Sequence, residues 1–182
     1  AWADPAADVV RFRPDHWLLV EAGRIAGVVQ AAPDPSWQRI DHAGRLILPG
    51  FVDTHVHSPQ LDVIGSYGAA LLDWLETYTV PAEIRYADPE VAEAGAGRFL
   101  DALLAHGTTS AVVFPTVHKV SADRLFAAAE ARGMRIVTGK VLMDRHAPDG
   151  PRDAADQAQR DGAALTGRWH GDARLPTAVT AD

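Results

Sequence analysis

The sequence predicts an α/β fold, the first half of a (β/α)₈ TIM barrel, preceded by a strand-rich segment. Three observations support this prediction. Short β-type runs and polar turns fill residues 1–50, whereas strands alternate with helices from residue 51 onward. The 182 residues are also fewer than the roughly 250 of a whole barrel. The expected domains are therefore residues 1–50 and residues 51–182.

The first fifty residues contain the signals of short paired strands. Apolar, β-branched runs at residues 17–20 and 25–29 flank the turn sequence Glu21-Ala22-Gly23-Arg24, which predicts a hairpin. A further run, residues 45–48, precedes Pro49-Gly50 and predicts another short strand.

Residues 51–57 are predicted to form a buried strand, and an unusually long connection follows them. This connection, residues 59–86, contains the short helical sequence LLDWLETY. Long loops inside compact domains are more often functional than idle. In a barrel, such a loop lies at the C-terminal ends of the strands, where active sites form.

Further helices and strands alternate after this connection. Asp88 as N-cap and Pro89 at the first helical position begin a helix that ends at Gly107. Ser121 is expected to cap the next helix, and Gly133 to end it. The strands are predicted at residues 108–114, 135–143 and 175–180, and a third helix has Ala158, Gly162, Leu165 and Trp169 on one face.

Composition excludes several classes of function. Lys and Arg total 17 against 24 Asp and Glu, and the net charge of −7 argues against nucleic-acid or anionic-membrane partners. The chain has no cysteine, which excludes disulfides, a thiolate zinc site and a cysteine nucleophile. No apolar run approaches the eighteen or so residues of a membrane span, and no signal-peptide core is visible. We expect a cytoplasmic globular protein.

The most informative stretch is PGFVDTHVHSPQ, residues 49–60. Side chains alternate along a strand, so Asp53, His55 and His57 should point to the same side. Two such imidazoles can reach one metal ion, and zinc accepts nitrogen ligands at about 2.0–2.1 Å. An isolated His-x-His on a surface strand carries no function. The strand context, the same-face Asp and the long following loop favour a metal site here.

The stretch GRLILPGFVDTHVH resembles the amidohydrolase superfamily, in which the first barrel strand supplies a His-x-His metal pair. The similarity to its guanine deaminases covers SPQLDVIGSYGAALLDWLETYTVPAE, GTTSAVVFPTVH, AAEARGMRIVTGKVLMDRHAPDG and RLPTAVT. The resemblance implies that residues 1–50 are part of a small β-sandwich domain built from both chain ends. It also implies zinc-dependent hydrolytic deamination of guanine to xanthine and ammonia, in purine metabolism, by an enzyme that is a homodimer when complete.

The resemblance assigns roles to particular residues. His55 and His57 match the first two metal ligands, and Gln60 matches the residue that hydrogen-bonds the purine. A side-chain amide suits that role because it both donates and accepts. Trp74 lies in the active-site loop, where it would either contact the substrate or pack in the core. Asp53 would support an imidazole.

The chain also departs from the family pattern. The later His and Asp ligands, the proton-shuttling Glu and the purine-binding Arg have no counterpart. We therefore expect no catalytic acid or base in this chain and no activity from its 182 residues alone. His118 and His146, the latter where the family has Asn, follow strands on the catalytic rim, but ordinary loop histidines are favoured over replacement ligands.

The remaining basic candidates are expected to be structural. Lys140 falls on the third barrel strand, whereas the carbamylated Lys of some amidohydrolases belongs on the fourth. His16, His42, His106 and His170 fall in turns or near helix ends.

Two alternatives stay open. One is another amidohydrolase that acts on a cyclic amide or a different aminopurine. The other is a non-catalytic fragment or partner module, because four strands leave an open sheet edge.

Overall fold

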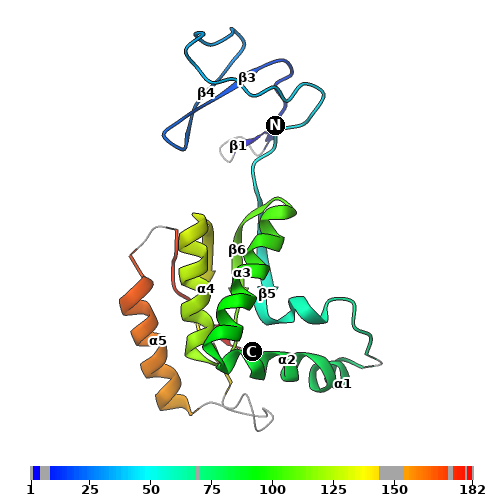
Figure 1. Ribbon diagram of the computed structural model, residues 1–182, viewed down its shortest axis with the longest axis vertical. Helices are drawn as coiled ribbons and strands as arrows, with labels where there is room; N and C mark the ends of the chain where they lie inside the picture. The colour runs from blue at the N-terminus through cyan, green and yellow to red at the C-terminus, as the bar shows by residue number, and fades with distance from the viewer. Residues whose placement is uncertain are drawn as a thin grey trace. The chain divides into compact units, whose positions relative to one another are not determined.

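The computed structural model describes residues 2–4, 9–68, 70–143, 154–171, 174–178 and 180–181. Figure 1 shows its helices and strands. The chain divides into two compact units, Ala1–Pro49 and Gly50–Asp182.

The strands of the first unit form two antiparallel pairs: β1 (Trp2–Asp4) with β2 (Val9–Arg11), and β3 (Trp17–Glu21) with β4 (Arg24–Val29). Between β3 and β4, Ala22 and Gly23 have positive φ angles of 49° and 74°. Two consecutive residues in this conformation make the type of turn that matches the twist of a hairpin. The hairpin predicted from the sequence is confirmed.

The strand predicted at residues 45–48 is wrong for the described chain. Residues 46–50 have no regular secondary structure, and Leu46 and Leu48 are 59% and 46% exposed. A strand is stable only when a neighbour satisfies its backbone hydrogen bonds. The β3–β4 pair does not extend to this segment, so its apolar residues alone do not make it a strand.

The second unit contains parallel strands joined by helices (Figure 1). β5 (Phe51–His57), β6 (Thr108–Phe114) and β7 (Arg135–Thr138) form a sheet in the order β5–β6–β7, and β8 (Val141–Leu142) pairs with β9 (Thr180–Ala181). The main helices are α3 (Pro89–Ala105), α4 (Lys119–Arg132) and α5 (Ala155–Trp169). Neighbours in sequence are therefore neighbours in the sheet, as in the predicted barrel.

Much of the long connection between β5 and α3 is helical. It consists of a 3₁₀ helix η1 (Ser58–Val63), the helix α1 (Leu71–Trp74), a π-helical turn η2 (Leu75–Thr79), α2 (Val80–Ile84) and a 3₁₀ turn η3 (Arg85–Ala87). The predicted helix LLDWLETY is confirmed by α1 and η2.

The last two predicted strands are each interrupted. The run at residues 135–143 is divided into β7 and β8 by Gly139, where a Cβ atom would overlap the carbonyl oxygen of Ala178. Residues 174–178 run beside β7: Ile136 N–H donates to Arg174 at 3.0 Å and Ala178 N–H donates to Thr138 at 2.9 Å. This close approach of two backbones, which requires glycine, was not evident from the β-type composition.

The ends of the helices follow the predicted caps with one exception. Asp88 Oδ1 accepts a hydrogen bond from Glu90 N–H at 2.8 Å, and Gly107 and Gly133 end their helices with φ angles of 84° and 66°. Ser121 does not cap α4, because the helix begins at Lys119 and the Ser121 side chain is buried against the core. The Ser121 N–H donates to the carbonyl of His118, the N-cap residue, at 2.9 Å, so Ser121 lies within the first turn and not before it.

One hydrophobic core joins the three main helices to the sheet. On β6, Ala111 and Val113 are buried on the helix side, and on β7 Ile136 is fully buried there. Helix α3 contributes Ala96, Phe99 and Leu100, α4 contributes Ala122, Leu125, Phe126 and Ala129, and α5 contributes Leu165 and Trp169. The alternation of the strands leaves their other residues facing away from the helices.

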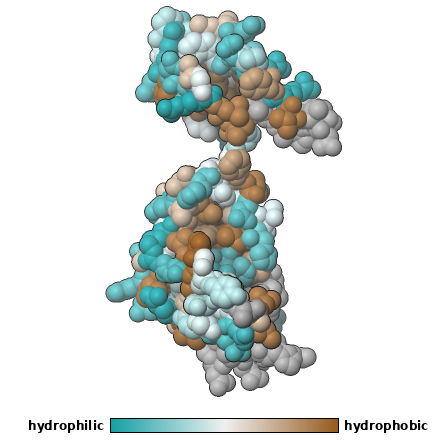
Figure 2. Space-filling model, turned by 90° about the vertical axis from the view of Figure 1, so that its right-hand side faces the viewer, coloured by the Kyte–Doolittle hydropathy of each residue, from teal (hydrophilic) through white to brown (hydrophobic). Residues whose placement is uncertain are grey.

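Strand β5 is not buried, contrary to the sequence prediction. It lies at the edge of its sheet, and Phe51 and Val52 are 55% and 66% exposed. Apolar surface is visible on the second unit in Figure 2; its exposed large apolar side chains are Phe51, Val52, Ile64, Tyr67, Leu71, Leu72, Ile84 and Leu104. None of the described helices is both long and apolar enough to cross a bilayer.

Candidate metal centre

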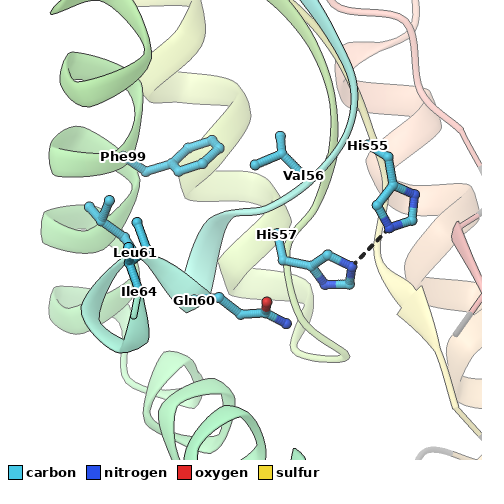
Figure 3. Close-up of a pocket in the computed structure, with 7 residues that line it drawn as sticks. All are labelled: His55, Val56, His57, Gln60, Leu61, Ile64 and Phe99. Carbon is cyan, nitrogen blue, oxygen red and sulfur yellow. Dashed lines mark hydrogen bonds between the residues drawn. The ribbon is translucent and has the colours of Figure 1, made fainter. Parts of the chain in front are cut away.

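His55 and His57 extend from the same side of β5, and their Nε2 atoms are 3.3 Å apart (Figure 3). Two nitrogens bound at 2.0–2.1 Å to one tetrahedral metal ion are separated by about 3.3–3.4 Å. The distance in the structure equals this separation and is also a hydrogen-bonding distance. The geometry is compatible with both imidazoles binding one divalent metal ion through Nε2, and their role as ligands stays a prediction.

The ring of Phe114 packs against both imidazoles. Its centroid is 4.7 Å from that of His55 and 5.0 Å from that of His57, and it is nearly parallel to the His57 ring, at 18°. Phe114 is the last residue of β6 and is the register partner of His57 on the neighbouring strand. It restricts the orientations of both rings before any ligand binds.

Asp53 supports the strand and not an imidazole ring. Its Oδ1 accepts a hydrogen bond from the backbone N–H of His55 at 3.0 Å. The sequence placed Asp53 beside the histidines correctly, but a short side chain bonds more readily to the backbone two residues away than to a ring.

Gln60 lies on η1, immediately after the two histidines. Ser58 and Pro59 are buried, which fixes the start of η1. The Gln60 amide lies near the His57 ring (Figure 3). The amide Nε2 donates to Glu83 Oε1 on α2 at 3.5 Å. Gln60 is thus held between β5 and α2.

The histidines and Gln60 border an open pocket of about 280 Å³. The imidazoles lie on one side of it and apolar side chains on the other (Figure 3). The lining residues are His55, Val56, His57, Gln60, Leu61, Ile64 and Phe99. Its volume lies just below the range of about 300–1,000 Å³ that is typical of small-molecule sites.

Trp74 is not among the residues that line this pocket. Its indole N–H donates to Ser66 Oγ at 2.8 Å and to the Ser66 carbonyl at 3.2 Å. Its Cβ also lies so close to Gly68 that a side chain there would clash. In this structure Trp74 holds the loop after η1, and a direct contact with substrate stays a prediction.

His118 and Lys140 follow β6 and β7, at the same end of the parallel sheet as His57. Burial, and then the Lys140 ammonium, lower the pKa of His118 below its usual value, and among the described residues its Nε2 has no hydrogen-bond partner. Lys140 is only 3% exposed, and burial lowers the pKa of its amine. His146 lies outside the described residues.

The predicted structural histidines near helix ends are confirmed. His106 caps α3 and its Nδ1 lies 2.8 Å from the Ala102 carbonyl, while His170 caps α5 and its Nδ1 lies 3.0 Å from Thr177 Oγ1.

Among the described residues, no cluster of three or more His, Asp or Glu side chains could hold a metal ion. The part of the chain that the structure describes thus brings together at most the two imidazoles of His55 and His57, fewer than the three ligands that a catalytic zinc normally has.

Two residues of the site were missed by sequence reasoning, Phe114 and Glu83. Phe114 had a usable signal, because the last residue of the next parallel strand lies level with the end of the first. Glu83 had none, because it is 23 residues from Gln60 and the long connection had to fold before they met.

Comparison with known proteins identifies the family that this chain resembles. The sequence pattern of the Amidohydrolase family matches residues 46–174. The chain is 43% identical over 180 residues to guanine deaminase of Escherichia coli (strain K12), covering 96% of this chain and 41% of that protein.

Solved structures agree in fold. A crystal structure of guanine deaminase from Bradyrhizobium japonicum has a TM-score of 0.71 and 41% identity, covering 73% of this chain and 29% of that one. Guanine deaminase from C. acetobutylicum, with bound guanine in the active site, has a TM-score of 0.78 and 27% identity, covering 92% and 41%. The resemblance noted in the sequence is confirmed, and the chain spans about two fifths of the length of the Escherichia coli protein.

Proposed function

This chain belongs to the amidohydrolase family, and from that premise we propose that it is part of an enzyme that hydrolyses guanine to xanthine and ammonia. The observation that carries the proposal is the site itself. Two imidazole nitrogens lie 3.3 Å apart beside a small, largely apolar pocket, and the Gln60 amide lies on the same border. The similarity to guanine deaminases over most of the chain supplies the substrate.

Family membership implies a metal cofactor, and we propose zinc, held by Nε2 of His55 and His57. Zinc accepts imidazole nitrogen readily and keeps one position open in catalytic sites. When bound, such a metal lowers the pKa of water toward neutrality and so provides a nucleophile. Other residues must complete the ligand set.

The residues of this chain bind and orient the reactants. In the overall reaction, water adds at the amino-bearing carbon of the ring, the carbon–nitrogen bond breaks, and the nitrogen leaves as ammonia after gaining a proton. Phe114 holds the imidazoles in place, and Gln60 hydrogen-bonds the ring so that this carbon faces them. The apolar side chains of Leu61 and Ile64 border the pocket beside Gln60.

Several parts of the proposal depend on more than this chain. We propose that residues 1–50 contribute to a small β-sandwich domain and residues 51–182 to a barrel, and that the complete enzyme is a cytoplasmic homodimer. We also propose that the 182 residues alone do not deaminate guanine, because the described residues bring only two ligands together. Proton transfer by a catalytic side chain contributes a further hundred- to ten-thousandfold.

The test is ammonia release from guanine by the complete gene product, with bound metal measured by elemental analysis. We expect zinc and turnover in the wild type, and loss of both in His55→Ala. The isolated 182-residue chain should release no more ammonia than its own His55→Ala variant. Turnover of adenine or of a cyclic amide in place of guanine would identify another amidohydrolase, and metal-independent turnover would refute the proposed site.

A further inference from the structure

The Gln60 amide has one favourable way to face Glu83. Its Nε2 is 3.5 Å from Glu83 Oε1, and both side chains are half-buried. An ionised carboxylate accepts hydrogen bonds and cannot donate them. Rotating the amide by 180° would place two acceptor oxygens against each other. Glu83 therefore directs Nε2 toward itself and leaves Gln60 Oε1 and one N–H for another partner.

The backbone of Gln60 is held in place without Glu83. Ser58 is 2% exposed at the start of η1. Further along η1, the Asp62 carboxylate receives two hydrogen bonds from the Arg98 guanidinium of α3, at 2.8 and 3.1 Å. The contact with Glu83 thus decides the orientation of the amide and not the position of η1.

Glu83 is also held on a constrained element. The wide turn η2 lies just before Pro81, which lacks an N–H and whose ring crowds the carbonyl four residues earlier in a regular helix. A π-helical turn accommodates this, and such turns are frequent at functional sites. Three residues after Glu83, Tyr86 is 4% exposed and packs so closely on Gly95 of α3 that a Cβ there would clash.

We propose that Glu83 is a positioning residue that fixes the Gln60 amide and thereby helps to select the purine. The inference rests on the proposed function and names a determinant of its substrate class. A fixed amide offers an acceptor and a donor in one order. This order complements a ring with an N–H beside a carbonyl oxygen, as in guanine, and opposes a ring with an amine beside a bare nitrogen, as in adenine.

The variant Glu83→Gln tests the proposal in the complete gene product. It preserves size, but glutamine can donate as well as accept, so the orientation of Gln60 is no longer imposed. We expect the KM for guanine to rise about five- to thirtyfold with kcat and bound metal unchanged. Competitive inhibition by adenine should strengthen relative to wild type. Glu93→Gln, on an exposed face of α3, is the matched control and should change none of these values.

A double-mutant cycle separates positioning from a general structural effect. In a Gln60→Ala background, Glu83→Gln should leave KM unchanged, because no amide remains to orient. Additive effects of the two substitutions, or an unchanged KM in a folded Glu83→Gln enzyme, would overturn this inference. Guanine turnover by the wild type would still support the proposed function. A wild type that binds metal but does not deaminate guanine would overturn both. If Glu83→Gln fails to fold, Glu83→Asp withdraws the carboxylate by one methylene, and the same outcomes apply.

Discussion

Phe114 offers a direct test of how the metal site is built. The ring contacts both imidazoles, at centroid distances of 4.7 and 5.0 Å. In Phe114→Leu, most of the apolar volume remains but the flat surface against both rings is lost. The imidazoles then sample more orientations in the free protein, and metal binding must restrict them.

The expected magnitude follows from the number of rings that are released. Ordering a side chain on binding costs about 0.5–1.5 kcal/mol. Two imidazoles therefore give about 1–3 kcal/mol, which corresponds to a roughly five- to 150-fold higher dissociation constant for zinc. Leucine at position 114 still restricts the two rings in part, so we expect an increase in the lower half of this range.

The assay is zinc competition with a chromogenic chelator on the complete gene product, with thermal unfolding measured in parallel. Phe126→Leu is the control: Phe126 is fully buried and stacks on Trp169, at 5.5 Å, within the helix-side core. It should lower the unfolding temperature and leave zinc affinity unchanged. A folded Phe114→Leu enzyme with wild-type zinc affinity would refute the reasoning, and so would an equal loss of affinity in Phe126→Leu.

Three further predictions follow from other residues. Gln60→Ala should raise the KM for guanine roughly ten- to a hundredfold and leave metal content unchanged, because a hydrogen bond to the substrate is lost. Steady-state kinetics and elemental analysis would contradict this if the KM stayed at the wild-type value while the bound metal decreased. Burial and Lys140 lower the pKa of His118 from its usual 6.5, so the unfolded state binds a proton at higher pH than the folded state, and the free energy of unfolding should fall as the pH drops below about 6.5. Urea unfolding at several pH values should show a weaker pH dependence of this free energy in His118→Asn. An identical pH dependence in the variant and the wild type would contradict the assignment to His118. Gly139→Ala should destabilise the protein by about 1–3 kcal/mol or more through overlap with the Ala178 carbonyl, whereas Gly162→Ala, in open space on α5, should stabilise it by about 0.5–1 kcal/mol; equal urea midpoints for the two variants would refute this.

The sequence by itself determined the elements whose signals are local. Asp88 and Pro89 predicted the start of α3 because a cap depends on backbone groups within one turn. The β-branched run at residues 108–114 predicted β6 to the residue. The two histidines also needed no partner to be placed together, because alternation along one strand puts His55 and His57 on the same face.

Tertiary structure decided whatever depends on a neighbour distant in the sequence. Residues 45–48 have the composition of a strand, but no strand of the described residues pairs with them. Strand β5 is exposed because it lies at a sheet edge. The break at Gly139 exists because another backbone passes close to it. Phe114 and Glu83 joined the site only when β6 aligned with β5 and the long connection folded back onto η1. A side chain's packing and hydrogen-bond partners are set by three-dimensional proximity, which no local pattern encodes.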